Sequence, residues 1–414
     1  MTLKNAGTQT ILIAFLTFVG LGLSAGLLGV AWPYMQEEFN LALDTVTVLL
    51  LAQTIAYTLA SFAIGRLMAR FGSGNSLIGG TLILALCMFA IAASGGWAWV
   101  VLFGLVAGFG SGVIDAGLNM YFTTYHSAGA MNWLHASFGI GITLGPLLMT
   151  YCALNLSWHV GYAVAGVVLV AIVALLAATR RLWRNEGFQS EENTPVRRAG
   201  FGESLRLPVL WFSMLTFLAY VSVEIGIGQW AYTLLTQSRG VSPEQAGTWV
   251  SVYWGVFTGG RIFFGFIANR FRPTSFLRWC LVMTIVGTLL LAWNPLPMVG
   301  LAGLVIVGFA EAPIFAMLMM TTPSRMGLEH AENGVSLQMV CVGLGSAILP
   351  GLIGTIGKTF GLEAMTITFA ATAVFALVAH ELAHRTPRKI DLPSAGVLVP
   401  RTRWPKRVYE ILRK

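Results

Sequence analysis

Hydrophobic runs of similar length recur along almost the whole chain and are separated by short polar loops. A helix that crosses a hydrocarbon core of about 30 Å needs about 20 mostly apolar residues. The apolar positions follow a helical period, and the runs are roughly twice as long as a barrel strand, so helices are favoured over a β-barrel. We predict twelve membrane-spanning helices, at residues 9–31, 45–65, 76–94, 98–120, 132–154, 159–179, 208–234, 246–268, 275–293, 298–320, 332–356 and 362–383.

The composition supports this prediction. Of 414 residues, 56% are hydrophobic and only 10% are charged, which is too apolar for the solvated surface of a soluble domain. The first run continues into "GVAWPYMQEEF" without a small-residue cleavage site, so we expect a retained helix rather than a signal peptide. Four cysteines lie in four different predicted helices without CxxC spacing, which indicates buried apolar side chains, and we expect no metal and no cofactor.

Positive charge predicts the orientation in the membrane. All but three of the 25 Lys and Arg residues lie on one side, in the loops, the linker and both termini. The exceptions are Arg239 and Lys358 on the other side and Arg261 within a predicted helix. Because loops rich in Lys and Arg stay in the cytoplasm, we predict an integral plasma-membrane protein, of the bacterial inner-membrane kind, with both termini cytoplasmic. The net charge of +8 then implies contact with anionic membrane lipids, and no nucleic-acid partner is expected.

The chain contains an internal repeat. "GRLMARFG" at 65–72 returns as "GFIANRFR" at 265–272, and "GFGSGVIDAGLNM" at 108 pairs with "GFAEAPIFAMLMM" at 308. "GIGITLGP" at 139 likewise matches "GLGSAILP" at 343. We predict an all-α polytopic membrane protein of two pseudo-symmetric six-helix bundles, 1–179 and 208–383, with a cytoplasmic linker at 180–207 and a basic tail at 384–414. The first, second, fourth and fifth helices of each half are expected to line a central cavity.

These motifs resemble the Major Facilitator Superfamily of transporters. "GRLMARFG" is similar to the family signature G-x-L-x-D-R-x-G, and the resemblance implies a gating role for the four matching residues, Gly65, Arg66, Arg70 and Gly72. The signature's aspartate is replaced by Ala69, and by Asn269 in the repeat, which removes the usual ion pair. "IDAGLN" followed by "LHASFGIG" resembles the fucose/glucose proton-symporter branch, which implies a coupling carboxylate at Asp115. The branch also implies one in the first helix, which here offers only Thr17 and Ser24.

Polar groups within the predicted helices mark candidate coupling sites. Asp115 and Asn119 are four residues apart and share a helix face, and His135 begins the next helix from the same side. We expect the three to meet in a cluster that can hold a proton or bind a hydroxylated ligand, or that only ties two helices together.

The second half supplies further candidates for proton coupling. Glu311 lies near mid-membrane, two residues before Pro313, which is expected to break its helix. Arg261 is expected either to pair with Glu311 or to extend to the cytoplasm. Glu224 is expected to titrate or to serve a gate. The proton-coupling candidates are thus Asp115, His135, Glu224 and Glu311.

Amide and aromatic side chains are candidates for solute binding. Amides can hydrogen-bond sugar hydroxyls, and aromatic faces stack on sugar C–H surfaces, although the same aromatics are common in cores and interface belts. The candidates are Asn119, Gln53, Tyr57, Gln229, Trp230, Tyr253, Trp254 and Gln338.

We interpret the sequence as a secondary active transporter, not an enzyme. It contains no P-loop, so an ion gradient would drive transport. The favoured activity is proton symport of a small-molecule solute, a sugar or polyol, by a monomer. The alternatives are proton-coupled export of amphipathic compounds, a non-transporting receptor, or a membrane-embedded enzyme, for which neither a nucleophile–base pair nor HExxH is found.

Overall fold

The computed structural model describes residues 3–126, 128–183, 199–267 and 272–386. Twelve helices within these ranges are long and apolar enough to cross a membrane, which confirms the predicted number of spans, although several run further than predicted, the first to Glu38 and the second to Phe71. The elements in chain order are α1 (Leu3–Ala25), α2 (Leu28–Glu38), η1 (Leu43–Thr45), α3 (Val46–Phe71), α4 (Ser73–Ala92), α5 (Trp97–Tyr125), α6 (Ala128–Asn155), α7 (Trp158–Ala178), η2 (Arg180–Leu182), α8 (Phe201–Leu205), α9 (Pro208–Thr233), η3 (Leu234–Ser238), α10 (Pro243–Ile267), α11 (Pro273–Trp293), α12 (Pro297–Glu311), α13 (Ile314–Met326), α14 (Leu328–Phe360) and α15 (Glu363–Arg385). Of the sequence features discussed above, the central linker residues 184–198, the repeat residues 268–271 and the tail from 387 lie outside the described ranges.

Two of the membrane spans are interrupted helices. The tenth span breaks between Glu311 and Ile314, as Pro313 predicted, because proline lacks the N–H that would bond the Phe309 carbonyl. The first span also breaks, at Gly26 and Leu27 between α1 and α2, and the sequence analysis did not predict this.

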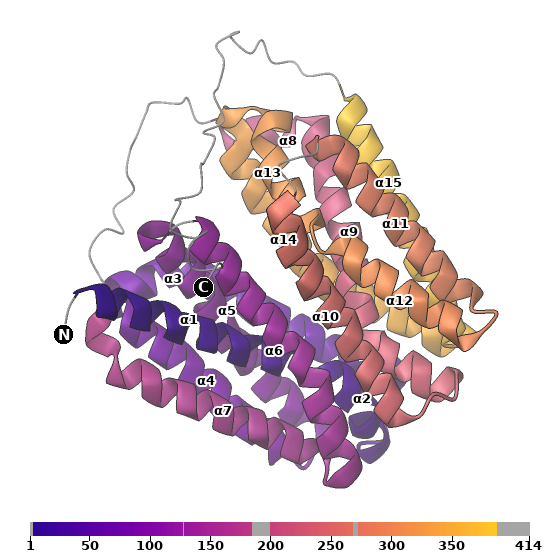
Figure 1. Cartoon of the computed structure of the whole chain (residues 1–414), viewed down its shortest axis with the longest axis horizontal. Helices are drawn as coiled ribbons and strands as arrows, with labels where there is room; N and C mark the ends of the chain where they lie inside the picture. Colours follow the sequence, from indigo (N-terminus) through magenta and orange to yellow (C-terminus); the bar gives the residue numbers. More distant parts are fainter. Residues whose placement is uncertain (1–2, 127, 184–198, 268–271, 387–414) are drawn as a thin grey trace, which may run out of the picture.

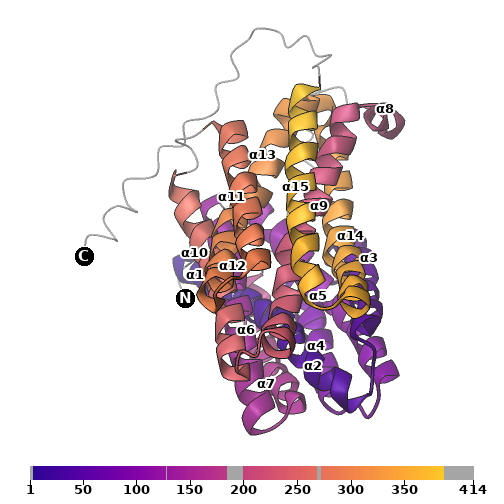
Figure 2. The same cartoon turned by 90° about the vertical axis from the view of Figure 1, so that its right-hand side faces the viewer.

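The helices form two bundles, α1–α7 and α9–α15, which meet near α2, α6 and α10 and diverge toward the end that carries the N-terminus (Figure 1). We call this end, which includes Gly72 and the helices η2 and α8 on either side of the linker, the linker end. The opposite end, at residues 39–45 and 239–242, is called the outer end. In the side view, the helices of the second bundle run lengthwise between the linker end and the outer end (Figure 2).

The predicted repeat is confirmed by equivalent helix packing in the two bundles. A Cβ on Gly108 of α5 would lie 2.3 Å from the Gln53 carbonyl oxygen of α3. At the positions 200 residues later, a Cβ on Gly308 of α12 would lie 2.8 Å from the Tyr253 carbonyl oxygen of α10. Only glycine permits these backbones to approach so closely.

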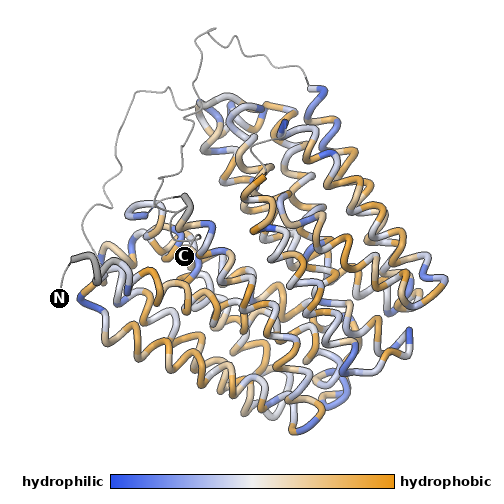
Figure 3. The backbone as a smooth tube through the Cα atoms, viewed as in Figure 1, coloured by the Kyte–Doolittle hydropathy of each residue, from blue (hydrophilic) through white to orange (hydrophobic). Residues whose placement is uncertain are grey.

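A second glycine contact repeats in the same way. A Cβ on Gly141 of α6 would lie 2.1 Å from the Val19 carbonyl oxygen of α1, and one on Gly345 of α14 would lie 2.6 Å from that of Leu218 in α9. Helices α4, α7, α11 and α15 pack against their own bundle. In the hydropathy view, hydrophobic residues prevail along the helices and hydrophilic residues gather near their ends (Figure 3). The packing matches the expected division into central and peripheral helices.

Contacts between the bundles gather in the outer part of the molecule, where glycine faces threonine. A Cβ on Gly247 of α10 would lie 1.9 Å from Thr150 Oγ1 of α6, and one on Gly351 of α14 would lie 2.3 Å from Thr47 Cγ2 of α3. We call these α6–α10 and α3–α14 contacts the glycine–threonine seam. Nearer the linker end, the position for a Cβ on Gly265 has no described atom within 4 Å.

Two polar contacts close the outer end beyond the seam. The hydroxyls of Tyr34 in α2 and Tyr232 in α9 are 2.8 Å apart. Lys358 Nζ of α14 lies 2.9 Å from the Asp44 carboxylate of η1. The structure is therefore closed at the outer end and separated at the linker end.

We expect Gly247→Ala to prevent closure of the outer end. The added methyl would overlap Thr150, and rotating that side chain would not help because its Cβ would be 2.7 Å away. The matched control is Gly255→Ala on the same helix, whose new Cβ would lie 3.4 Å from Thr143, an ordinary contact.

Spin labels on the exposed residues Asn155 and Gln245, at the ends of α6 and α10, would measure the effect. Gly247→Ala should lengthen the distance between the labels, and Gly255→Ala should leave it unchanged. Identical distance distributions in both variants would show that the seam does not control closure.

Candidate functional site

A polar cluster on α3 and α5 surrounds Asp115. The Tyr57 hydroxyl donates a hydrogen bond to the Asp115 carboxylate. The Asn119 amide donates to the same carboxylate at 3.1 Å and to the Asp115 main-chain carbonyl at 2.9 Å. Asp115 and Asn119 are half-buried and Tyr57 is 37% exposed. The carboxylate is thus held by two donors and remains within reach of the space beside α3.

The packing of α3 on α5 explains this pairing. Gly104, Gly108 and Gly112 form one face of α5, and a Cβ on Gly112 would lie 2.5 Å from the Tyr57 carbonyl oxygen. Asp115 continues that face by one turn, so it meets the Tyr57 side chain. The glycine spacing could have predicted the Tyr57–Asp115 pair, which the sequence analysis did not.

His135 does not join this cluster, so the expectation that three residues meet was wrong. The α6 helix packs along α1 and α10, and His135 contacts Phe18 of α1 edge-on, with ring centroids 5.9 Å apart. Among the described residues His135 has no hydrogen bond to Asp115 or Asn119. Consecutive helices in the chain are here not close neighbours, because α1 packs along the length of α6.

The cluster lies at the depth where the bundles separate. A Cβ on Gly343 of α14 would lie 3.8 Å from Oγ1 of Thr58, the residue next to Tyr57. The corresponding contact on the other side of the seam joins Gly139 and Thr258. Tyr57 and the residues just beyond Thr258 therefore lie beside contacts between the two bundles.

A second charged cluster lies on the other side, within the second bundle. Arg261 of α10 pairs with Glu224 of α9 at 3.8 Å, and its guanidinium lies over the Phe257 ring at 4.3 Å from the centroid. The predicted alternatives, a pair with Glu311 or extension to the cytoplasm, are both replaced by this Glu224 pair. Glu311 is 1% exposed, and neither of its carboxylate oxygens has a hydrogen-bond partner among the described residues.

Three of the predicted solute-binding residues instead connect helices inside the second bundle. The Tyr253 hydroxyl donates to the Glu224 main-chain carbonyl at 2.8 Å, and Trp230 Nε1 donates to the Pro350 carbonyl at 2.8 Å. Gln338 accepts from Thr322 at 2.9 Å and donates to Ser213 at 2.8 Å. Tyr253 and Gln338 are completely buried and Trp230 is 1% exposed, so none of them can contact a solute in this conformation.

The other three lie closer to the boundary between the bundles. Gln53 is half-buried on α3, one turn before Tyr57. Gln229 faces α2, because a Cβ on Gly29 would lie 3.2 Å from the Gln229 carbonyl oxygen. The side-chain Nε2 of Gln229 has no hydrogen-bond partner among the described residues. Trp254 packs on Gly228 of α9. Gln53 and Gln229 remain candidates for solute binding.

The arginines of the signature loop have no described acidic partner, as expected from the replacement of the signature's aspartate by Ala69. Arg66 and Arg70 are exposed, and no described carboxylate forms an ion pair with either, while the Arg70 guanidinium lies 5.5 Å from the Phe71 ring centroid. Gly72 ends α3 at φ 81°, a backbone conformation that favours glycine. Gly65 has only the Met120 methyl near its Cβ position, at 3.8 Å.

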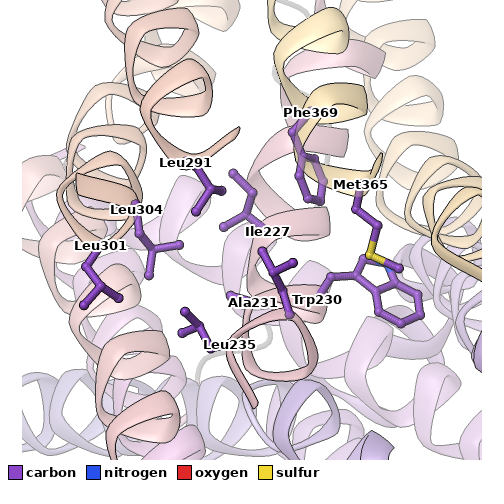
Figure 4. A pocket seen from close by; sticks show the side chains of 11 residues that line it. Ile227, Trp230, Ala231, Leu235, Leu291, Leu301, Leu304, Met365 and Phe369 are labelled. Carbon is purple, nitrogen blue, oxygen red and sulfur yellow. The ribbon is translucent and has the colours of Figure 1, made fainter. Parts of the chain in front are cut away.

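An apolar pocket inside the second bundle offers no site for a polar solute (Figure 4). Its lining residues are Ile227, Trp230, Ala231, Leu234, Leu235, Leu291, Gly300, Leu301, Leu304, Met365 and Phe369. The described residues also contain no group of three His, Cys, Asp or Glu side chains that could hold a metal ion.

Comparison with known proteins settles the family. Residues 13–350 match the family model of the Major Facilitator Superfamily, and residues 231–406 give a second match. The chain belongs to the Major Facilitator Superfamily. Among its relatives, the glucose/mannose transporter GlcP of Bacillus subtilis (strain 168) is 22% identical over 358 residues, which cover 83% of this chain and 87% of GlcP.

Solved structures of this superfamily share the fold. A bacterial homologue of the human lysosomal transporter Spinster, inward-facing and occupied, aligns with a TM-score of 0.77 at 15% identity over 92% of this chain and 97% of that one. The D-xylose–proton symporter aligns with a TM-score of 0.72 at 14% identity over 92% and 97%. These similarities show that the chain shares the fold of both structures.

We expect Gln338→Leu to destabilise the protein. It leaves the Ser213 hydroxyl without its amide donor in a buried position, and an unsatisfied buried group costs about 1–3 kcal/mol. Thermal unfolding in detergent should show a lower midpoint for Gln338→Leu than for Gln245→Leu, an exposed control. Equal midpoints would contradict a structural role for Gln338.

Proposed function

We propose that this transporter moves a small polar solute, a sugar or polyol, together with a proton, by alternating access of its two bundles. The observation that carries the proposal is the position of Asp115, a carboxylate with two hydrogen-bond donors at the depth where the bundles separate. A carboxylate in a membrane interior is costly and usually functional. The similarity to a glucose/mannose transporter and to the structure of a D-xylose–proton symporter supports both the sugar and the proton.

The proposed coupling uses the three residues of the Asp115 cluster. Asp115 would exchange the proton, and the Tyr57 and Asn119 groups that now bond it would turn to solute hydroxyls when the carboxyl is neutral. Gln53, one turn before Tyr57 on α3, adds an amide at the same wall. The carboxylates of the first span, Glu37 and Glu38, are exposed at its outer end, so Asp115 would act without a partner carboxylate on that span.

We further propose that the linker end faces the cytoplasm, in a plasma membrane, so that the structure is open inward. The Lys and Arg distribution supports this orientation.

Labelling of intact cells can test the orientation. All four native cysteines are buried, so an introduced cysteine would be labelled against a low background. An impermeant maleimide should react with Thr359→Cys, exposed at the outer end, and not with Gly202→Cys, exposed on α8 at the linker end. The reverse pattern would show that the protein has the opposite orientation.

For Asp115→Asn we expect accumulation to fall to passive equilibration while exchange of solute across the membrane is retained. Asparagine keeps the shape of the side chain but cannot bind and release the proton. The measurement is uptake and counterflow of labelled D-glucose and D-mannose in proteoliposomes with an inward proton gradient. Glu37→Gln, at an exposed outer position, is the control.

Uphill accumulation by Asp115→Asn equal to that of the parent protein would make the cluster structural. Transport of neither sugar by the parent protein would instead reject the proposed solute and leave the fold assignment unchanged.

A further inference from the structure

A charged contact at the outer end of the first bundle has no part in the proposed coupling. Glu38 is the last residue of α2, and His159 lies in the first turn of α7. His159 Nε2 is 3.1 Å and 3.2 Å from the two carboxylate oxygens of Glu38, one of which also accepts a hydrogen bond of 2.7 Å from Trp158 Nε1. The side chain of His159 is 30% exposed and that of Glu38 is 41% exposed, so the pair is in contact with the solution at this end.

The surroundings of His159 favour the binding of a proton. On the other side of its ring, His159 Nδ1 is 2.9 Å from the main-chain carbonyl oxygen of Ala92, at the end of α4. A carbonyl and an ionised carboxylate can only accept hydrogen bonds, and a neutral imidazole has a single N–H to donate. Both contacts can be hydrogen bonds only when both ring nitrogens carry a proton. The same number of protons is bound if Glu38 carries the proton and donates it to Nε2, so this conformation favours one bound proton in either case.

The charged groups near His159 are few. Helix α7 packs against α1, α2, α4, α6 and η2. Among the described residues of these elements, α4 and α6 have no acidic or basic side chain in their last turns, α1 continues into α2, and η2 lies at the linker end. Besides Glu38, α2 contributes the exposed Glu37, and the carboxylate of Asp44 in η1 pairs with Lys358 instead. A change in the charge of His159 therefore acts chiefly on the end of α2.

Helix α2 connects the Glu38–His159 pair to a contact that closes the outer end. It packs on α9 of the second bundle, and the hydroxyl of Tyr34 in α2 is 2.8 Å from that of Tyr232 in α9. Two residues that are not helical separate α2 from α1, so α2 can rotate about this break without disturbing α1. One end of α2 thus adjoins a hinge, and the other end is held to α7 through Glu38.

Loss of the proton weakens the hold on α2. A neutral His159 can donate a hydrogen bond to Ala92 or to Glu38 but not to both, and it no longer attracts the carboxylate by its charge. The contact is therefore complete at low pH and is weakened as the pH rises. Because exposed ion pairs contribute modestly to stability, we expect the ratio of the closed to the open outer end to change by up to about fivefold.

We propose that Glu38 and His159 form a pH-dependent anchor that keeps α2 in the closed position. With the proton bound, α2 stays where Tyr34 meets Tyr232. When the proton passes to water at the outer end, α2 moves away from α9 more readily and the outer end opens. This inference rests on the opening of the outer end and goes beyond the proposed coupling, because neither the solute nor Asp115 takes part in it.

The test is the distance between two spin labels in the full-length protein without solute. One label replaces Ala42, which is exposed just beyond α2, and the other replaces Gln237, which is exposed on η3 of the second bundle. Between about pH 5 and about pH 8, where histidine changes its charge, the parent protein should shift toward longer distances as the pH rises. His159→Gln carries no charge and should show the parent's high-pH distribution at every pH. His159→Arg stays charged and can donate to both acceptors, so it should keep the low-pH distribution.

A matched control and a second variant keep the test decisive. His384→Gln makes the same substitution at an exposed position at the linker end of α15, and it should respond to pH as the parent does. If the His159 variants do not fold, Glu38→Gln gives the test from the other partner: its amide oxygen can still accept from Trp158, but it has no charge and should match the high-pH distribution at every pH. Asp115→Asn should keep the shift, which separates the anchor from the proposed coupling.

Three results would overturn the proposal. The first is a parent protein whose distances do not change with pH, and the second is a full pH response in any of the variants at His159 or Glu38. The third is a response that is lost in His384→Gln or in Asp115→Asn.

Discussion

Helices α3 and α5 approach so closely at Gly108 and Gly112 that a methyl group at either position would overlap a backbone carbonyl of α3. The same kind of contact joins α1 to α6 and α9 to α14, whereas between the two bundles Gly247 and Gly351 each face a threonine side chain. Without water to drive helices together inside a membrane, such packing supplies much of the attraction between them. It also brings Tyr57 and Asp115 within hydrogen-bonding distance, so the polar site depends on the glycine face beside it.

The two bundles have the same helix packing but place their polar groups differently. In the first, Asp115 lies half-buried with two donors at its carboxylate, whereas in the second, Glu311 is buried beside the Glu224–Arg261 pair and has no hydrogen-bond partner among the described residues. Position 315, the repeat of Asp115, is a phenylalanine, and position 61, the repeat of Arg261, is a serine. Duplication therefore preserved the glycine contacts, while the chemistry of the two halves diverged.

Much of the fold could be predicted from the sequence because the signals are long or local. Runs of apolar residues marked the twelve spans, Pro313 marked the break after Glu311, and matched glycines revealed the repeat. The site was harder to predict because it depends on which helices touch. The sequence places His135 one loop from Asp115, yet α6 packs along α1 and α10.

The burial of the predicted solute-binding residues could not be predicted from residue type either. Trp230 and Gln338 have the chemistry of sugar-binding residues, but their polar atoms bond Pro350, Thr322 and Ser213 inside one bundle. A side-chain amide on a helix can form hydrogen bonds with a neighbouring helix as readily as with a ligand. Only its neighbours in the folded structure show which of the two it does.

The central claim is that transport requires the outer end to open and close while the bundles stay intact. Lys358 Nζ and the Asp44 carboxylate, on opposite bundles, are 2.9 Å apart in the closed form, so cysteines at these two positions can be joined by a short reducible cross-linker. The account predicts that cross-linking stops transport of labelled hexose in proteoliposomes, and that reduction restores it. Transport at the uncross-linked rate with the outer end held closed would contradict alternating access in this protein.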